Sequence, residues 1–330
     1  MSQPLPALAE LHKIRPAIYW MDFLASGAVG WTAFAAAVAY PLGAPVGVAA
    51  IVVAIVALNR AVAFTHEISH QSRRLPGFEA VWNALVGFPL LVPTFIYGRV
   101  HLDHHRVAIY GTAGDPSYLP FARSAWLAGA YMLQTLIAPV FLIVRFFLLA
   151  PVGLASRRFE NWLLAHASAI TFNPAYRRTP GADLVRAARR GTVFLLALWA
   201  ALVALALLAP NPAIPARAAA LWYLVLTAIN VLEGLRSLAE HAYDSSGAPL
   251  DKAGQIADSH DMPGGLFTEF WAPVGLRFHA THHAYPGIPY YALPRAYRRL
   301  VAEAPEHEKR TRAGLVPTLR QLFGKGARRG

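Results

Sequence analysis

Four long apolar stretches alternate with polar stretches along the chain. A helix needs about 20 mostly apolar residues to cross the hydrocarbon core of a bilayer. Two pairs of segments approach or meet this length, and a short proline-containing turn joins the members of each pair: residues 17–40 with 42–58, and 191–209 with 218–232. The pattern predicts four membrane-spanning helices arranged as two hairpins.

Two further apolar segments are interrupted. Residues 82–97 contain two prolines, and residues 126–150 contain Gln134, Pro139 and Arg145. If neither segment crosses, every lysine and arginine outside the spans lies on one side except Arg217. Positive charge gathers on the cytoplasmic side of membrane proteins. We therefore predict that both segments are in-plane or re-entrant, and that both termini are cytoplasmic.

The composition agrees with a membrane protein. The chain is 56% hydrophobic and 15% charged, whereas soluble domains are about 25% charged. The net charge of +12 favours anionic lipid or an acidic protein as a partner, and no nucleic-acid partner is expected. The absence of cysteine excludes disulfides, thiolate-bound clusters, cysteine zinc sites and cysteine nucleophiles.

Histidines are the remaining nitrogen donors, and most fall in three motifs. These are His66-Glu-Ile-Ser-His70, His101-Leu-Asp-His104-His105 and His279-Ala-Thr-His282-His283. Random placement of thirteen histidines predicts roughly 0.02 His-x-x-His-His motifs, whereas the chain has two. Helical residues three and four apart share a face, so each motif presents at least two imidazoles to one point. All three motifs lie on the predicted cytoplasmic side.

The number of these histidines indicates which metals, and how many, they could bind. Imidazole binds iron, copper, nickel and zinc, but a zinc ion usually takes four ligands or three plus water. The eight motif histidines exceed that set and suit two metals that retain open positions for dioxygen. Glu67 and Asp103 lie within the motifs, so we expect them either to bond to the rings or to be ordinary solvated carboxylates.

The motifs and their surroundings resemble the membrane fatty acid desaturase superfamily, specifically the bacterial histidine-box desaturases. The resemblance covers residues 58–123 and 221–300. It includes Gly98-Arg99-Val100-His101, Tyr110-Gly111-Thr112, Asp115-Pro116, Leu235 through His241, Trp271 through His279, and Pro289-Tyr290.

The resemblance implies a di-iron centre with the eight motif histidines as ligands. His241 occupies the position after the last span where the family has a further histidine ligand. Some members have an asparagine one turn earlier that reaches iron through water, and this chain has Ser237 there. We expect His260 to be a pocket-loop residue.

We expect a single all-α domain over residues 1–330, with a cytoplasmic helical cap and a basic tail at residues 295–330 that lies on the surface. The resemblance places it in a bacterial inner membrane. The expected substrate is a lipid or fatty acyl chain, in a channel lined by the second and fourth spans. No haem or dinucleotide motif is present, so electrons for O2 should come from a separate donor such as a ferredoxin.

The favoured function is desaturation of a fatty acyl chain. An unactivated methylene group has no acidic proton, so a metal centre that uses dioxygen is needed to oxidise it. Removal of two hydrogens gives an alkene, and oxygen transfer after the first gives an alcohol. The stretch Glu240-His241-Ala242-Tyr243 is similar to alkane hydroxylases, so hydroxylation of an alkane, carotenoid or other lipid remains an alternative. A zinc-dependent membrane lipid hydrolase and a non-catalytic lipid receptor are further alternatives.

Overall fold

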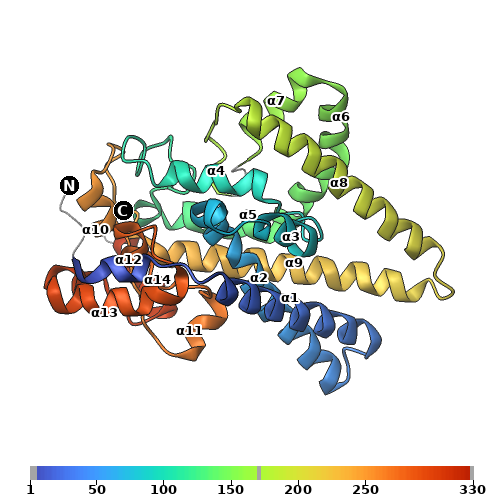
Figure 1. Cartoon of the computed structure of the whole chain (residues 1–330), viewed down its shortest axis with the longest axis horizontal. Helices are drawn as coiled ribbons and strands as arrows, with labels where there is room; N and C mark the ends of the chain where they lie inside the picture. The colour runs from blue at the N-terminus through green and yellow to red at the C-terminus, as the bar shows by residue number, and fades with distance from the viewer. Residues whose placement is uncertain (1–5, 169–171, 328–330) are drawn as a thin grey trace.

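The computed structural model describes residues 6–168 and 172–327, and every regular element in these ranges is a helix (Figure 1). Four long helices correspond to the four predicted spans: α1 (Pro16–Ala39), α2 (Pro45–Gln71), α8 (Ala182–Leu207) and α9 (Ala213–Glu240). α1 packs along α2. Pro16 and Pro45 lie in the first turns of α1 and α2, where a helix has no use for a proline N–H.

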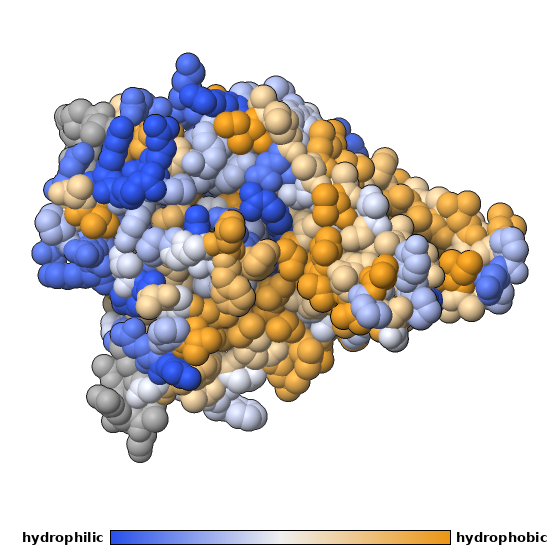
Figure 2. All heavy atoms as spheres, turned by 90° about the horizontal axis from the view of Figure 1, so that it is seen from below, coloured by the Kyte–Doolittle hydropathy of each residue, from blue (hydrophilic) through white to orange (hydrophobic). Residues whose placement is uncertain are grey.

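The outer surface separates into two parts. Figure 2 shows hydrophobic residues spread over the helices that extend to the right and hydrophilic residues gathered over the cap at the left. The exposed apolar side chains on the long helices include Val48, Val52, Leu205 and Leu207. Large contiguous apolar surfaces mark contact with a membrane or a partner, so this part of the surface suits a bilayer.

Among the described residues, five helices are long and apolar enough to cross a membrane, one more than the sequence predicts. The fifth is the continuous helix Ala125–Ala155, which comprises α5 (Ala125–Ile143), a π-helical turn η5 (Val144–Leu149) and α6 (Ala150–Ala155). Its interior Pro139 and Arg145 do not end it, because the π-helical turn accommodates the change in hydrogen bonding.

Both ends of Ala125–Ala155 contact the same end of the α8–α9 pair. Near its start, Tyr131 packs with Leu238, close to the end of α9. Near its end, Leu154 accepts a 2.6 Å hydrogen bond from Arg189, close to the start of α8. Figure 1 shows α8 and α9 diverging from their common turn toward the cap, so this long helix lies across the open end of the pair.

Residues 82–97 form a broken segment that enters the bundle. It passes from α3 (Phe78–Trp82) through η3 (Asn83–Gly87) to the start of α4 (Thr94–His104). Trp199 of α8 donates to the carbonyl of Phe88 (3.0 Å) and Trp222 of α9 to that of Pro89 (2.8 Å). Irregular backbone is tolerated at membrane depth where protein groups satisfy it.

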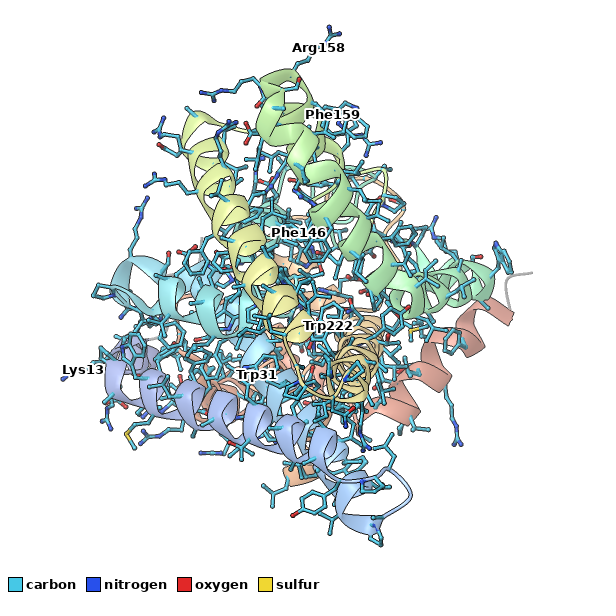
Figure 3. All side chains as sticks on the ribbon, turned by 90° about the vertical axis from the view of Figure 1, so that its right-hand side faces the viewer. Lys13, Trp31, Phe146, Arg158, Phe159 and Trp222 are labelled. Carbon is cyan, nitrogen blue, oxygen red and sulfur yellow. The ribbon has the colours of Figure 1, made fainter. Side chains whose placement is uncertain are left out.

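Figure 3 shows the same packing with side chains drawn. Trp31, Phe146 and Trp222 lie among the helices, whereas Arg158 points away from them. Trp31 of α1 donates to the carbonyl of Leu85 (2.9 Å). The broken segment is thus held from α1, α8 and α9 together.

The cap is built from short helices and the C-terminal region. It contains α10 (Lys252–Asp258), α11 (Leu266–Trp271), α12 (His279–Ala284), α13 (Leu293–Glu303) and α14 (Leu315–Ala327). The short helix α7 (Arg157–His166) packs against α6 and α8 instead, away from these helices (Figure 1). The tail is more deeply packed than the sequence suggests, because Leu300, His307 and Leu322 are buried. On α13, Leu300 packs inward while Arg295 and Arg298 are exposed.

The close contact of α1 with α2 at Gly30 leads to a prediction about the stability of the protein. A Cβ atom on Gly30 would lie 2.7 Å from the Leu58 side chain and 3.2 Å from its backbone nitrogen. We expect Gly30→Val to lower stability by about 1–3 kcal/mol through overpacking, measured as a lower melting temperature in detergent. Gly27→Val in the same helix is the matched control, since nothing lies within 4 Å of a Cβ there. Equal melting temperatures for the two variants would contradict the packing argument.

Candidate metal centre

Nine histidine rings from four separate parts of the chain converge in the cap. His66 and His70 lie on α2, His101 and His104 on α4 with His105 at its end, and His279, His282 and His283 on α12. His241 follows the last residue of α9. The long helices α2 and α9 therefore extend beyond the predicted spans and carry their histidines into the cap.

The rings form two groups that could each hold a metal ion. His66, His70, His101 and His282 form the first, and His104, His241, His279 and His283 form the second, with the nitrogens of each group within 4.8 Å of one another. His105 lies between the groups. Its Nε2 is 3.1 Å from Nε2 of both His101 and His282, and its ring centre is 4.4 Å from that of His283.

The spacing of the nitrogens fits ligands on a shared ion. Pairs of Nε2 atoms from neighbouring rings lie 2.9–3.3 Å apart. Two nitrogens bound about 2.1 Å from one metal at roughly right angles lie about 3.0 Å apart. The Nε2 atom of His101 faces both His70 and His105 at such distances, which a single lone pair or proton satisfies poorly.

Several buried ring nitrogens have no hydrogen-bond partner within the described residues. Among the clustered rings they are both nitrogens of His66 and the Nδ1 atoms of His105, His279, His282 and His283. Leaving a buried polar group unpaired costs about 1–3 kcal/mol. Metal ions at the Nε2 atoms would use the lone pair of His66 Nε2, which has no partner, and those of the Nε2 atoms that face one another, so the donor set fits two bound metals.

The rings in the cap favour the uncharged form. Burial lowers the pKa of each, and repulsion from neighbouring rings adds to the effect; the rings are His101, His105, His279, His282 and His283. An uncharged imidazole has a lone pair to give to a metal. The cluster is therefore prepared to bind a cation.

Two rings of the second group are held by hydrogen bonds at Nδ1. His104 Nδ1 lies 2.8 Å from Asp115 Oδ1, and the Asp115 carboxylate also accepts from the backbone N–H groups of Gly111 and Ser117. His241 Nδ1 lies 2.9 Å from the Tyr110 hydroxyl. A partner at Nδ1 leaves Nε2 free to face the metal and fixes the ring orientation.

Other carboxylates lie close to the rings. Tyr110 donates to Asp258 (3.1 Å), and burial raises the pKa of Asp258 to about 6. Glu240 Oε1 lies 3.5 Å from His279 Nδ1, and Glu67 Oε1 lies 3.6 Å from His66 Nδ1. Carboxyl groups from α2, α9 and α10 thus surround the rings.

The sequence proposes two carboxylates as supports for the rings, and the structure places only one of them beside a ring. Glu67 lies beside His66, but Asp103 does not reach the cluster. It pairs with Arg106 (3.2 Å) and accepts from Tyr176 (2.5 Å) instead. The reason is helical geometry, because position 103 points away from the face shared by positions 101, 104 and 105.

Sequence reasoning missed Tyr110, Asp115, Asp258 and Glu240 as supporting groups. Asp115, Tyr110 and Glu240 lie in stretches that carry the resemblance, but nothing in their spacing indicates contact with a ring. Asp258 is the last residue of α10, which lies outside every motif. His260 is buried beside Ala239, whose carbonyl lies 2.9 Å from its Nδ1, outside both groups of four.

A cavity of about 160 Å³ adjoins both groups of rings. Its wall includes the rings His66, His101, His104, His241 and His279. α9 supplies one side from Asn230 to Glu240, including Ser237, and α4 and α5 supply the opposite side. α2 contributes only His66 to this cavity.

Comparison with known proteins gives two findings. A family model described as fatty acid desaturase matches residues 41–314, a range that includes all nine clustered histidines. A protein named ceramide hydroxylase, from Caulobacter vibrioides (strain NA1000 / CB15N), is 32% identical over 332 residues, which cover 97% of this chain and 92% of that protein.

The hydrogen bond between His104 and Asp115 leads to a prediction about metal binding. We expect Asp115→Asn to weaken metal binding by about 10–100-fold, because support of a ligating ring is commonly worth that much. The measurement is the metal retained by purified protein during dialysis against a graded series of chelator. Asp103→Asn is the control, since the carboxylate it changes bonds elsewhere. Equal retention in both variants would show that the Asp115 contact does not support a ligand.

Proposed function

The chain belongs to the fatty acid desaturase family, and we propose that it is an oxygen-dependent, di-iron hydroxylase of a ceramide-like lipid. The observation that carries the proposal is the convergence of the nine histidines in two adjacent groups. The likeness to the ceramide hydroxylase extends over nearly the whole of both chains, which supports the reaction and the substrate class.

Desaturation is the second candidate. The sequence favours it, and the matching family model carries that description. Both reactions begin with loss of a hydrogen atom from an unactivated carbon, so the histidines do not distinguish them. The name of the relative, ceramide hydroxylase, favours hydroxylation here.

Two irons held by the nine rings would supply the oxidising power, using O2 and electrons. In hydroxylation one C–H bond is replaced by a C–O bond. One oxygen atom enters the product, and the other leaves as water with two protons and two electrons from an external donor. The chain's own task is to hold the rings, position the lipid and exclude bulk water, and burial of His104 and His283 (2% and 0% exposed) serves the last.

We propose that the electrons come from a separate acidic protein such as a ferredoxin. Lys252 lies on the cap surface, and its Nζ donates to the carbonyl of His283 (2.5 Å). An electron donor bound over the exposed Lys252 side chain would be connected to the metal site through the backbone of His283. Opposite charge on the donor would favour encounter.

The contact between His104 and His241 supports four crossings rather than five. Three candidate spans lie between these residues: Ala125–Ala155, α8 and α9. Since the two rings are 3.3 Å apart, the chain must return to the same side, so an even number of the three crosses. Ala125–Ala155 contacts one end of the α8–α9 pair at both of its own ends. We propose that it does not cross, and that the basic cap faces the cytoplasm.

The absence of native cysteine makes this arrangement testable by single-cysteine labelling. We expect Gly43→Cys and Asn211→Cys, in the two hairpin turns, to react in intact cells with a membrane-impermeant thiol reagent. Arg158→Cys and Ser246→Cys should react only after permeabilisation. Labelling of Arg158→Cys in intact cells would mean that Ala125–Ala155 crosses.

The reaction is tested by expressing the full chain in a bacterium that makes ceramides and analysing its lipids by mass spectrometry. We expect a ceramide that has gained one oxygen atom, and loss of this product with His282→Ala. A ceramide or acyl chain that has lost two hydrogens instead would support desaturation.

Metal analysis of the same protein separates both reactions from a zinc hydrolase. We expect two irons per chain, and a reduced iron content in His282→Ala and His283→Ala, which alter different groups. One zinc per chain and activity without oxygen would overturn the proposal.

A further inference from the structure

Many of the side chains that line the cavity beside the rings are polar, although the proposed substrate is mostly hydrocarbon. Of the side chains that α9 contributes, Asn230, Glu233, Arg236, Ser237 and Glu240 all carry hydrogen-bonding or charged groups. From α4 and α5 come Tyr97, Tyr131 and Thr135. A channel made for the middle of an alkyl chain should instead be lined by apolar side chains.

An ion-pair chain forms the centre of this wall. Arg236 donates to Glu233 Oε2 (2.6 Å) on one side and to Glu240 on the other. The side chains of Arg236 and Glu240 are only 8% and 6% exposed. Buried charges of this kind are costly unless they are fully paired, so their position beside the metal site requires an explanation.

One acceptor in this chain of charges is unmatched. Glu233 Oε1 is buried and has no hydrogen-bond partner within the described residues. A methylene group placed against it would leave it unmatched, whereas an amide N–H or a hydroxyl would bond to it. The wall therefore suits a donor group on the substrate.

The size of the cavity also suits the polar end of a lipid rather than a whole lipid. Pockets that enclose a drug-sized ligand have volumes of about 300–1,000 Å³, and this one has about 160 Å³. It has room for the polar end of a lipid and the first carbons of its chains. The long tails have to lie outside it.

We infer that the amide and hydroxyl groups of the lipid occupy this cavity, with a donor group on Glu233, and that the carbon oxidised lies within a few bonds of them. The inference rests on the proposed function. It assigns Glu233 as a residue that selects polar lipids and sets the position of oxidation. An apolar mid-chain carbon would be excluded from the centre by the same wall.

The position of the new oxygen tests the inference without any variant. Wild-type protein, loaded with iron and supplied with a donor in nanodiscs, is given a ceramide of defined chain lengths, and fragmentation mass spectrometry locates the hydroxyl. We expect it near the amide. A hydroxyl in the middle of a tail would overturn the inference while leaving the proposed function intact, and absence of any oxidised ceramide would overturn both.

Binding without turnover is the second test. A fluorescent short-chain ceramide is titrated into protein that has no electron donor. We expect Glu233→Gln to weaken its binding by about tenfold, as loss of a hydrogen bond to a charged group does, and a wax ester to compete poorly against wild type. Glu160→Gln is the matched control, because Glu160 pairs with Arg189 (3.1 Å) away from the cavity. Equal binding by both variants would remove the assignment of Glu233.

Discussion

The fold is governed by the need to hold nine imidazole rings, most of them buried, within contact of one another. Packed at 2.9–3.3 Å between Nε2 atoms, these rings would repel if protonated, and when neutral they leave several nitrogens unmatched. Cations bound among the Nε2 atoms would take the place of protons there and would use the lone pairs that face one another. The protein therefore keeps a costly arrangement whose cost a bound metal would reduce.

Membrane helices are a natural support for such a cluster. A helix that must satisfy its own backbone in lipid is stiff along its whole length, and α2 and α9 carry that stiffness past the membrane to His66, His70 and His241. The other rings belong to α4 and α12, which are short helices. Their place is fixed by packing and by hydrogen bonds such as that of Asp261 to the backbone N–H of Thr281 (3.0 Å). Long helices and short, hydrogen-bonded helices thus position the rings of one site together.

Sequence patterns predicted the long helices and the family well. Length, hydropathy and proline turns identify α1, α2, α8 and α9, and the spacing of the motifs picks out the rings that converge. Patterns failed where contacts are remote in sequence. Asp258 reaches His241 through Tyr110, a relation between three distant segments that no local signal encodes. Asp103 was chosen because it lies inside a motif, yet helical direction takes its side chain away. The number of candidate spans also differed, because helix Ala125–Ala155 continues through a proline and an arginine that normally interrupt one.

The division of labour between the rings and the cavity bears on how this family changes its reaction. The rings present the same nitrogens whether an alcohol or an alkene is formed, so they set the oxidising power and not the product. What differs between substrates is which carbon is brought to the centre and how firmly it is held after the first hydrogen is lost. We propose that in this chain both depend on the wall formed by Glu233, Arg236 and Glu240. Charged groups in a low-dielectric site hold a polar partner more tightly than water would. A lipid anchored in this way has little freedom to present a second carbon, which is the condition under which oxygen transfer to the first carbon prevails.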